Sequence, residues 1–208
     1  MTTARTRLWL VRHGQIAANL TGHWHGWTDS PLTDTGRTQV TRVAGWFADA
    51  AHPVAAVYTS PLQRTHDTAR GIASALGLEA EPVLALREYG IGELEGTPYK
   101  ALRDEHRFFD RIRDEPDWAP AGGESLRDVV TRMHDTFTDI SARHAGEDVV
   151  LVSHGAAMAL TIAHLLHADA LEWGQYHVSN CSVSEFCLMP EPALGMFNST
   201  AHLEGEDA

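Results

Sequence analysis

Three short, continuous runs of apolar residues constrain the fold of this chain more than any other feature of its sequence. They occupy residues 8–11, 54–58 and 149–152 and contain several β-branched side chains. None of them shows the alternation of apolar and polar positions that marks a strand with one solvent-exposed face. Each run is therefore predicted to be a strand buried on both faces of a mostly parallel sheet.

Helical patterns separate and follow these runs. Apolar residues at helical spacing predict helices over residues 35–51, 60–76, 125–140 and 156–167. Ser60 and Pro61 suit the N-cap and the first position of the second helix, Gly77 suits its end, and Ser125 opens the third. Alternating strands and helices predict an α/β fold, a three-layer sandwich with helices on both faces of the central sheet.

The rest of the chain completes a single predicted domain over residues 1–208. Residues 88–122 are rich in Gly, Pro, charged and aromatic residues, and are predicted to form a small inserted lid of loops and short helices over the carboxyl ends of the strands. Two late segments, 182–188 and 195–199, are predicted to be further strands. The acidic tail, residues 203–208, is expected to be disordered.

The charge balance argues against a protein that binds nucleic acid or anionic membranes. Lys and Arg number 16 against 28 Asp and Glu, which gives a net charge of −12, whereas such binders concentrate positive charge on one face. Two cysteines are too few for a disulfide framework, and no apolar stretch approaches the ~20 residues of a spanning helix. A cytoplasmic protein is expected, and the sequence leaves a homodimer open.

Positively charged and imidazole side chains follow the predicted strands. They are Arg12, His13, Arg64 and His154. Because the carboxyl ends of parallel strands meet at one edge of a sheet, these side chains are expected to gather there. Guanidinium groups and helix N-termini both favour a phosphoryl group, and a neutral imidazole can attack phosphorus. Gly14 and Gly155 are expected to let the backbone approach the anion closely.

Four motifs in this order resemble the histidine phosphatase superfamily, which is also called phosphoglycerate mutase-like, and in particular its phosphatase branch. The motifs are Arg12-His13-Gly14, residues 60–69 (SPLQRTHDTA), Arg87-Glu88 and Ser153-His154-Gly155. Residues 29–33 and 122–125 add supporting signatures, so that the resemblance covers about residues 7–188. It implies the same α/β fold and a phosphate site at the carboxyl edge of the sheet.

The resemblance also implies a role for each site residue. His13 would be the phosphorylated nucleophile, and Glu88 would protonate the leaving alcohol and then activate water. Asn19 and Gly155 would bind phosphate or substrate. Three further residues would hold the phosphoryl group: Arg12, Arg64 and His154. No metal and no cofactor is needed in this scheme.

The expected activity is metal-independent hydrolysis of a phosphomonoester through a phosphohistidine intermediate. The substrate would be a small phosphorylated metabolite, namely a sugar phosphate, a phosphoglycerate derivative or a broad range of esters. The compact insert favours this branch over the mutases, which resemble it but shield the phosphohistidine under a longer lid. A cofactor-dependent phosphoglycerate mutase-type phosphotransferase, a non-catalytic protein that binds phosphorylated ligands and a metallohydrolase remain the alternatives.

Several other residues bear on the surroundings of the site. His23 and His25 are expected to lie on a substrate-facing loop without metal. Five aromatic residues are expected near the pocket mouth, where an apolar pocket for the leaving group is a second interpretation beside ordinary core packing: Trp24, Trp27, Phe108, Phe109 and Trp118. Four histidines are expected to have no part in the chemistry: His52, His106, His144 and His202.

Overall fold

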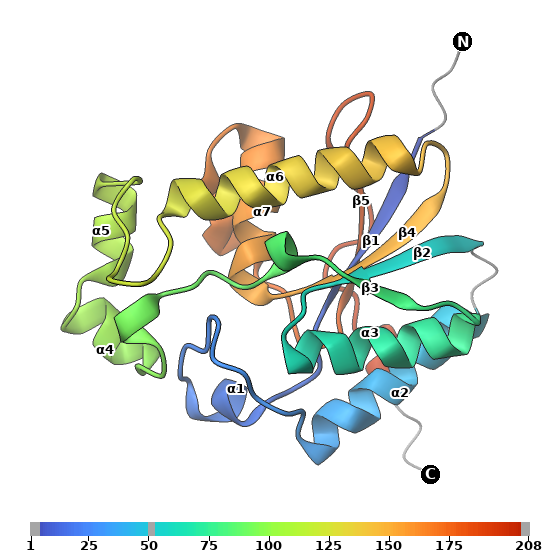
Figure 1. The fold of residues 1–208 in the computed structure, drawn as a ribbon, viewed down its shortest axis with the longest axis horizontal. Coiled ribbons are helices and arrows are strands. Elements are labelled where there is room, and N and C mark those ends of the chain that lie inside the picture. Colours follow the sequence, from blue (N-terminus) through green and yellow to red (C-terminus); the bar gives the residue numbers. More distant parts are fainter. Residues whose placement is uncertain (1–4, 50–52, 205–208) are drawn as a thin grey trace.

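The computed structural model describes residues 5–49 and 53–204, and its centre is a sheet of six strands (Figure 1). The strands are β1 (Arg7–Arg12), β2 (Val54–Thr59), β3 (Ala80–Pro82), β4 (Asp148–Ser153), β5 (Val183–Cys187) and β6 (Ala193–Leu194). Their order is β3-β2-β4-β1-β5-β6. The strands from β3 to β1 in this order are parallel, β5 pairs antiparallel with β1, and β6 pairs antiparallel with β5. The three apolar runs thus form the parallel centre of the sheet, as predicted. Burial on both faces is confirmed for the runs in β1 and β4 but is wrong at the start of β2, where Ala55 is exposed.

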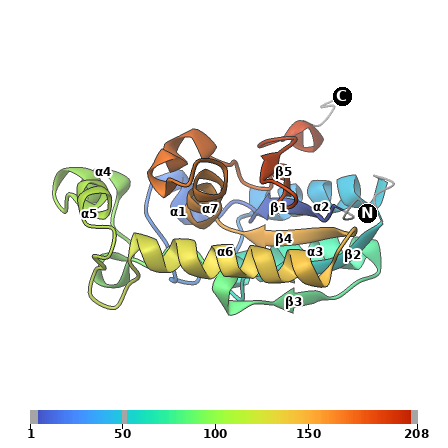
Figure 2. The same ribbon diagram turned by 90° about the horizontal axis from the view of Figure 1, so that it is seen from above.

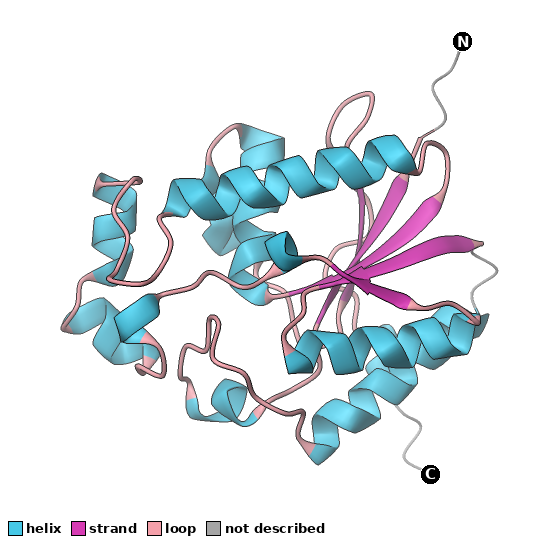
Figure 3. Ribbon diagram, viewed as in Figure 1, coloured by secondary structure: helices cyan, strands magenta, loops and turns pink. Residues whose placement is uncertain are grey.

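Helices cover both faces of this sheet (Figures 1, 2 and 3). The α-helices are α1 (Ala17–Thr21), α2 (Asp34–Asp49), α3 (Gln63–Leu76), α4 (Tyr99–Asp104), α5 (Phe108–Asp114), α6 (Leu126–Arg143) and α7 (Gly155–His167). Short 3₁₀ helices are η1 (Leu84–Leu86), η2 (Gly92–Leu94), η3 (Ala170–Tyr176) and η4 (Ala201–Leu203). The predicted α/β sandwich is confirmed.

Two hydrophobic cores lie on the two faces because side chains alternate along each strand. In β1, Leu8 and Leu10 belong to the core beneath α6 and α7, whereas Trp9 and Val11 belong to the core beneath α2 and α3. All four side chains are at most 3% exposed. A strand that is apolar at every position is therefore what this double-sided packing requires.

The predicted start of the second helix, with Ser60 as N-cap and Pro61 as its first position, is two residues too early. Helix α3 begins at Gln63, because the N–H of Ser60 donates to the carbonyl of Val152 at 3.1 Å and so keeps Ser60 beside β4. The Ser60 hydroxyl accepts the N–H of Leu62 at 3.3 Å, within the turn that precedes the helix. The predicted end is confirmed, since Gly77 adopts a φ of 69°, which favours glycine.

The later part of the chain mixes confirmed and wrong predictions. Strand β5 lies within the predicted segment 182–188, but no strand spans 195–199 in the described residues. There, Ser199 makes an isolated bridge to Val183, and the short strand β6 comes earlier. Leu203, at the start of the predicted disordered tail, belongs to η4. Residues 205–208 lie outside the described residues, so the expected disorder stays a prediction.

The segment 88–122 consists of loops together with η2, α4 and α5, beyond the carboxyl ends of the parallel strands (Figure 1). Its boundaries as a lid, and the single domain over residues 1–208, stay predictions. None of the helices in the described part of the chain has the length and apolarity that crossing a bilayer requires. Residues 50 and 51, at the end of the helix predicted over 35–51, lie outside the described residues.

Candidate active site

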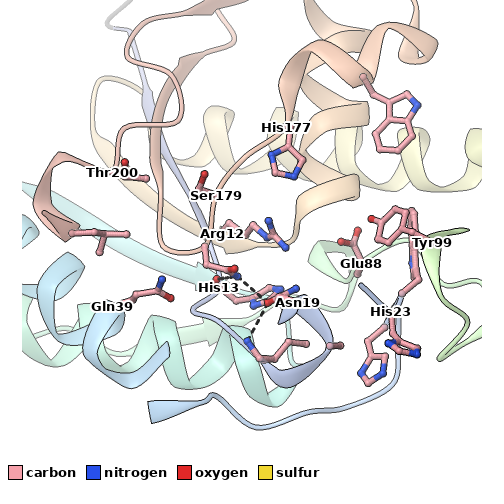
Figure 4. A pocket seen from close by; sticks show the side chains of 17 residues that line it. Arg12, His13, Asn19, His23, Gln39, Glu88, Tyr99, His177, Ser179 and Thr200 are labelled. Atoms are coloured by element: carbon pink, nitrogen blue, oxygen red, sulfur yellow. Dashed lines mark hydrogen bonds between the residues drawn. The ribbon is translucent and has the colours of Figure 1, made fainter. Parts of the chain in front are cut away.

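A cavity of about 620 Å³ opens at the carboxyl edge of the sheet beside His13 (Figure 4). Four of the predicted site residues line it: Arg12, His13, Asn19 and Glu88. Arg64 and His154 do not line it, and both are almost completely buried next to His13, whose ring centroid lies 5.3 Å from that of His154. The fold therefore brings the predicted charged and imidazole groups together.

His13 stands at the carboxyl end of β1, where its N–H donates to the carbonyl of Ser153 at 3.1 Å. Its ring Nδ1 lies 2.7 Å from the carbonyl oxygen of Gly14, so Nδ1 carries the proton and Nε2 keeps its lone pair. Burial, together with the charges of Arg64 and Arg12, lowers the pKa of His13 well below the ordinary value. His13 is thus a neutral imidazole with a free Nε2, the form that can act as a nucleophile.

His154 follows β4 and is fully buried. Its Nδ1 accepts a hydrogen bond from Nε of Arg64 at 3.3 Å, so the proton of the neutral ring is on Nε2. Burial, followed by the charge of Arg64, lowers the pKa of His154 well below the ordinary value. The protonated Nε2 has no hydrogen-bond partner within the described residues, which is costly for a buried donor unless a ligand supplies the acceptor.

The two predicted arginines have different surroundings. Arg12 donates from Nη1 to the carbonyl of Val178 at 2.6 Å, while its buried Nε is unpaired among the described residues. Arg64 donates to three backbone carbonyls of one loop, those of His25, Gly26 and Thr28, at 2.7–3.1 Å. Arg64 therefore holds this loop and His154, and its predicted contact with a phosphoryl group stays a prediction.

Glu95 holds the same loop from its other side. Its carboxylate accepts the N–H groups of Gly26, Trp27 and Thr28 at 2.8–3.0 Å and the Thr28 hydroxyl at 2.7 Å. It also accepts the N–H of Ile91 at 3.2 Å. The loop that carries His25 to the cavity is thus fixed between an arginine that binds its carbonyls and a glutamate that binds its amides, a pairing that the sequence did not indicate.

Glu88 is 8% exposed and lines the cavity together with His13. One carboxyl oxygen accepts the N–H groups of Tyr89 at 2.9 Å and Ala157 at 2.8 Å, and the other accepts the N–H of Ala156 at 3.1 Å. Two of these donors belong to the first turn of α7, where backbone N–H groups lack partners within the helix. The N-terminal end of α7 therefore positions the Glu88 carboxyl group beside the cavity.

The two glycines of the motifs differ in how closely their surroundings pack. A Cβ on Gly14 would lie 2.8 Å from the carbonyl oxygen of Gly36 in α2, and the N–H of Gly14 donates to the Thr68 hydroxyl at 3.0 Å. Gly14 is thus required by its packing against α2, and its expected approach to an anion stays a prediction. A Cβ on Gly155 would meet the guanidinium of Arg12 at 3.5 Å, an ordinary contact. The predicted substrate contact of Gly155 stays a prediction.

Asn180 is a site residue that the sequence analysis missed. Its Nδ2 donates to the carbonyl of His13 at 2.9 Å and to Oδ1 of Asn19 at 3.1 Å. Asn19 also accepts the N–H of Ile16 at 3.0 Å, so its predicted contact with phosphate or substrate stays a prediction. Asn180 reaches the site because β5 runs antiparallel to β1, which places the loop before Val183 at the carboxyl edge. The direction of β5 would have been the signal.

The aromatic residues near the cavity differ from those predicted. Trp24 lines it, but the other four do not: Trp27, Phe108, Phe109 and Trp118. Their places are taken by Tyr99 and Trp173. His23 and His25 line the cavity, as expected for a substrate-facing loop, and among the described residues no three His, Cys, Asp or Glu side chains gather as a metal site.

The four histidines expected to stand apart from the chemistry are not among the lining residues of the cavity where they are described. His144 binds Tyr58 and Glu147, and His202 binds the carbonyl of Cys181. His106 is exposed, and His52 lies outside the described residues. Where they are described, these histidines are therefore separate from the cavity.

Comparison with known proteins agrees with this geometry. The profile of the histidine phosphatase superfamily (branch 1) matches residues 8–193, and the chain belongs to this family. A probable phosphoglycerate mutase of Klebsiella pneumoniae (strain 342) is 32% identical over 190 residues, which cover 90% of this chain and 87% of the relative. The resemblance inferred from the four motifs is thus confirmed.

Solved structures extend the comparison. A phosphoserine phosphatase of Entamoeba histolytica, in complex with 3-phosphoglyceric acid, superposes with a TM-score of 0.84 at 28% identity, covering 96% of this chain and 100% of that one. A mycobacterial glucosyl-3-phosphoglycerate phosphatase in complex with VO3 has a TM-score of 0.80 at 27% identity, with coverages of 93% and 99%. The chain is an enzyme of the phosphoglycerate mutase-like phosphomonoesterase class.

The free energy of unfolding should decrease as the pH falls below about 6.5, the ordinary pKa of histidine in an unfolded chain. His13 and His154 stay neutral in the folded protein because their pKa values are lowered, so the unfolded state binds protons that the folded state does not. Below about pH 6.5, each of the two histidines then lowers the free energy of unfolding by up to about 1.4 kcal/mol per pH unit. Well above this pH, neither histidine makes the free energy of unfolding depend on pH.

Urea unfolding between about pH 7.5 and pH 5.5 measures this loss. His154→Gln should make the free energy of unfolding depend less steeply on pH, whatever its effect at neutral pH. The exposed His106 offers the matched control, since His106→Gln should retain the wild-type slope. A His154→Gln slope equal to that of the wild type would contradict the neutral, buried state of this imidazole.

Proposed function

We propose that this protein hydrolyses a small phosphorylated metabolite through a phosphohistidine intermediate, without a metal ion. The observation that carries the proposal is a pair of buried N–H donors, Nε of Arg12 and Nε2 of His154, that have no partner within the described residues. Both side chains belong to the surroundings of the neutral ring of His13. A phosphoryl group offers the acceptor oxygens that both donors lack. Its phosphorus would then stand near the nucleophile.

The reaction has two steps. In the first, Nε2 of His13 attacks phosphorus, the bond from phosphorus to the ester oxygen breaks, and Glu88 donates a proton to the departing alcohol. In the second, Glu88 removes a proton from a water molecule whose oxygen attacks the phosphohistidine, which releases inorganic phosphate and the neutral imidazole. Arg12 and His154 donate to the charged oxygens in both transition states. Arg64 keeps the His154 ring in the required tautomer.

Hydrolysis is favoured over phosphoryl transfer by the access of water to the cavity. Asn19, Tyr99 and His177 line it and are solvent-exposed. The similar solved structures described above are of phosphatases, whereas the relative from Klebsiella pneumoniae supports a mutase as the second candidate. Phosphorus NMR with 3-phosphoglycerate separates the two, because hydrolysis yields inorganic phosphate and a mutase yields the isomeric ester.

Phosphatase activity should survive EDTA and be inhibited by vanadate, which mimics pentacovalent phosphorus. Arg12→Ala should weaken vanadate inhibition by about 10-fold to 100-fold, since a charge-assisted hydrogen bond of about 1.5–3 kcal/mol is lost. Arg103→Ala provides the control, because this arginine is exposed and pairs with Asp104 on α4. Loss of activity on chelation that a divalent ion restores would instead support a metallohydrolase.

A further inference from the structure

One wall of the cavity is aromatic. Trp24 after α1, Tyr99 at the start of α4 and Trp173 in η3 all line it. The ring centroids of Trp24 and Tyr99 lie 5.2 Å apart. Tyr99 and Trp173 each stack on Phe109, at 6.1 Å and 6.2 Å, so contacts between rings hold the wall in place. This wall can cover the flat face of an apolar group.

The aromatic wall begins beside the proposed proton donor. Figure 4 shows Tyr99 next to Glu88. Desolvation of the phenol, followed by the charge of Glu88, raises the pKa of Tyr99 to about 12. Since Glu88 would protonate the ester oxygen, the carbon attached to that oxygen would lie near Tyr99. The organic part of a substrate would therefore meet the aromatic wall directly beyond the phosphoryl group.

The same cavity holds no second permanent cation among its described lining residues. Arg12 is the only arginine or lysine that lines it, and its unpaired Nε belongs to the phosphoryl site. The one lysine of the chain, Lys100, is exposed and pairs with Asp104 at 2.6 Å. A carboxylate on the substrate would lose water without gaining a permanent opposite charge, which is unfavourable.

The remaining wall offers neutral hydrogen-bonding groups. Figure 4 shows Gln39, Ser179 and Thr200 on the side of the cavity away from Tyr99. His177 also lines it. Partial desolvation of its ring, followed by the charge of Arg12, lowers its pKa, which leaves the ring neutral at pH 7. Amide and hydroxyl groups of this kind suit the hydroxyl groups of an uncharged alcohol.

From this division of the cavity we infer that, if the proposed hydrolase function holds, the substrates are phosphate esters of uncharged alcohols that carry an apolar, ring-sized group. Esters of carboxylate-bearing alcohols, such as phosphoglycerates, are poor substrates. The cavity volume of about 620 Å³ lies within the range of small-molecule sites and accommodates a phosphoryl group together with a ring. Specificity therefore rests on the aromatic wall and on the missing second cation.

Three primary alkyl phosphates test this inference: 2-phenylethyl phosphate, glycerol 3-phosphate and 3-phosphoglycerate. Each releases a strongly basic primary alkoxide, so differences between them report on binding of the organic group rather than on leaving-group reactivity. The value of kcat/KM should decrease in this order, with the first at least about 10-fold above the last. Trp173→Ala should lower kcat/KM for the phenylethyl ester about 10-fold more than for the glycerol ester.

Two further variants sharpen the test. Leu171→Ala is the matched control, because Leu171 lies on the same helix η3, is 40% exposed and does not line the cavity. The Leu171→Ala enzyme should keep the wild-type ratio of kcat/KM for 2-phenylethyl phosphate to kcat/KM for glycerol 3-phosphate. His177→Arg should raise kcat/KM for 3-phosphoglycerate relative to glycerol 3-phosphate, because it supplies a cation for the carboxylate.

The inference is overturned if 3-phosphoglycerate has the highest kcat/KM. It is also overturned if Trp173→Ala lowers kcat/KM for the phenylethyl ester and for the glycerol ester by the same factor. If no ester releases phosphate, the hydrolase proposal fails by itself. Binding of the corresponding non-hydrolysable phosphonates, measured by calorimetry, then decides the specificity: tighter binding of the carboxylate-bearing phosphonate overturns the inference, and tighter binding of the phenyl-bearing one supports it.

Discussion

Replacing His13 with alanine should lower kcat/KM for every phosphomonoester substrate by on the order of 10⁵-fold while the protein remains folded. The variant removes the lone pair that would attack phosphorus, and only the charge stabilisation by Arg12 and His154 remains. Steady-state rates with p-nitrophenyl phosphate measure the loss. Circular dichroism and thermal unfolding show that the variant is folded, and His13→Gln repeats the test with less change in volume.

A phosphoryl trapping experiment identifies the residue directly. With ³²P-labelled substrate, the wild-type enzyme quenched in base should carry label on the peptide that contains His13, and acid should release this label. The exposed His106 supplies the control, since His106→Ala should retain both label and rate. Label on a different residue, or a His13→Ala enzyme of undiminished activity, would show that His13 is not the nucleophile.

Glu88→Gln should slow phosphoryl transfer from an alkyl ester by about 10²-fold to 10⁴-fold, and from an aryl ester far less. An alkoxide needs a proton from the carboxyl group to leave, whereas p-nitrophenolate is stable without one. The burst of alcohol release from glycerol 3-phosphate and from p-nitrophenyl phosphate, followed by rapid quench, reports the first step alone. Steady-state kcat would mix in the hydrolysis of phosphohistidine, in which Glu88 also acts.

The geometry around Glu88 makes the comparison of two esters necessary. An amide nitrogen in place of one carboxyl oxygen would face a backbone N–H that now donates to it, such as that of Ala156, and would displace the side chain. A displaced side chain slows both bursts, whereas the loss of a proton donor slows only the alkyl burst. Glu95→Gln is the matched control, because Glu95 holds the loop at residues 26–28 and should affect both bursts alike. Equal slowing by Glu88→Gln would mean that Glu88 is not the general acid.

Much of the fold could be predicted because it depends on local patterns. The strand β1 is apolar at consecutive positions, and Ser125 caps α6 by accepting the N–H of Asp128. Features with weak local signals were missed. Strand β3 has three residues, too few to show a pattern, and Ser60 had the type of an N-cap but is held beside β4 by a long-range hydrogen bond.

The charged and imidazole groups at the candidate site could be predicted from the sequence, but its other members and their contacts could not. Arg12, His13 and Glu88 lie together at the cavity because strand ends and the start of α7 converge at one edge of the sheet. The aromatic lining was predicted correctly only at Trp24, since Trp118 packs elsewhere while Trp173 arrives from η3. Which aromatic residue reaches a cavity depends on how distant segments pack, and residue type alone carries no such information.

The sequence by itself determined the three central strands, the long helices and the charged and imidazole residues at the carboxyl edge, because periodicity, capping and motif order are properties of neighbouring residues. Only the tertiary structure decided which hydrogen-bond donors of the site have acceptors within the protein and which do not. It assigned most of Arg64 to a backbone loop, left Nε of Arg12 and Nε2 of His154 without partners in the described residues, and buried both imidazoles in their neutral form. Donor partners and burial arise from contacts between segments far apart in the chain, and these contacts form only when the sheet and its loops are assembled.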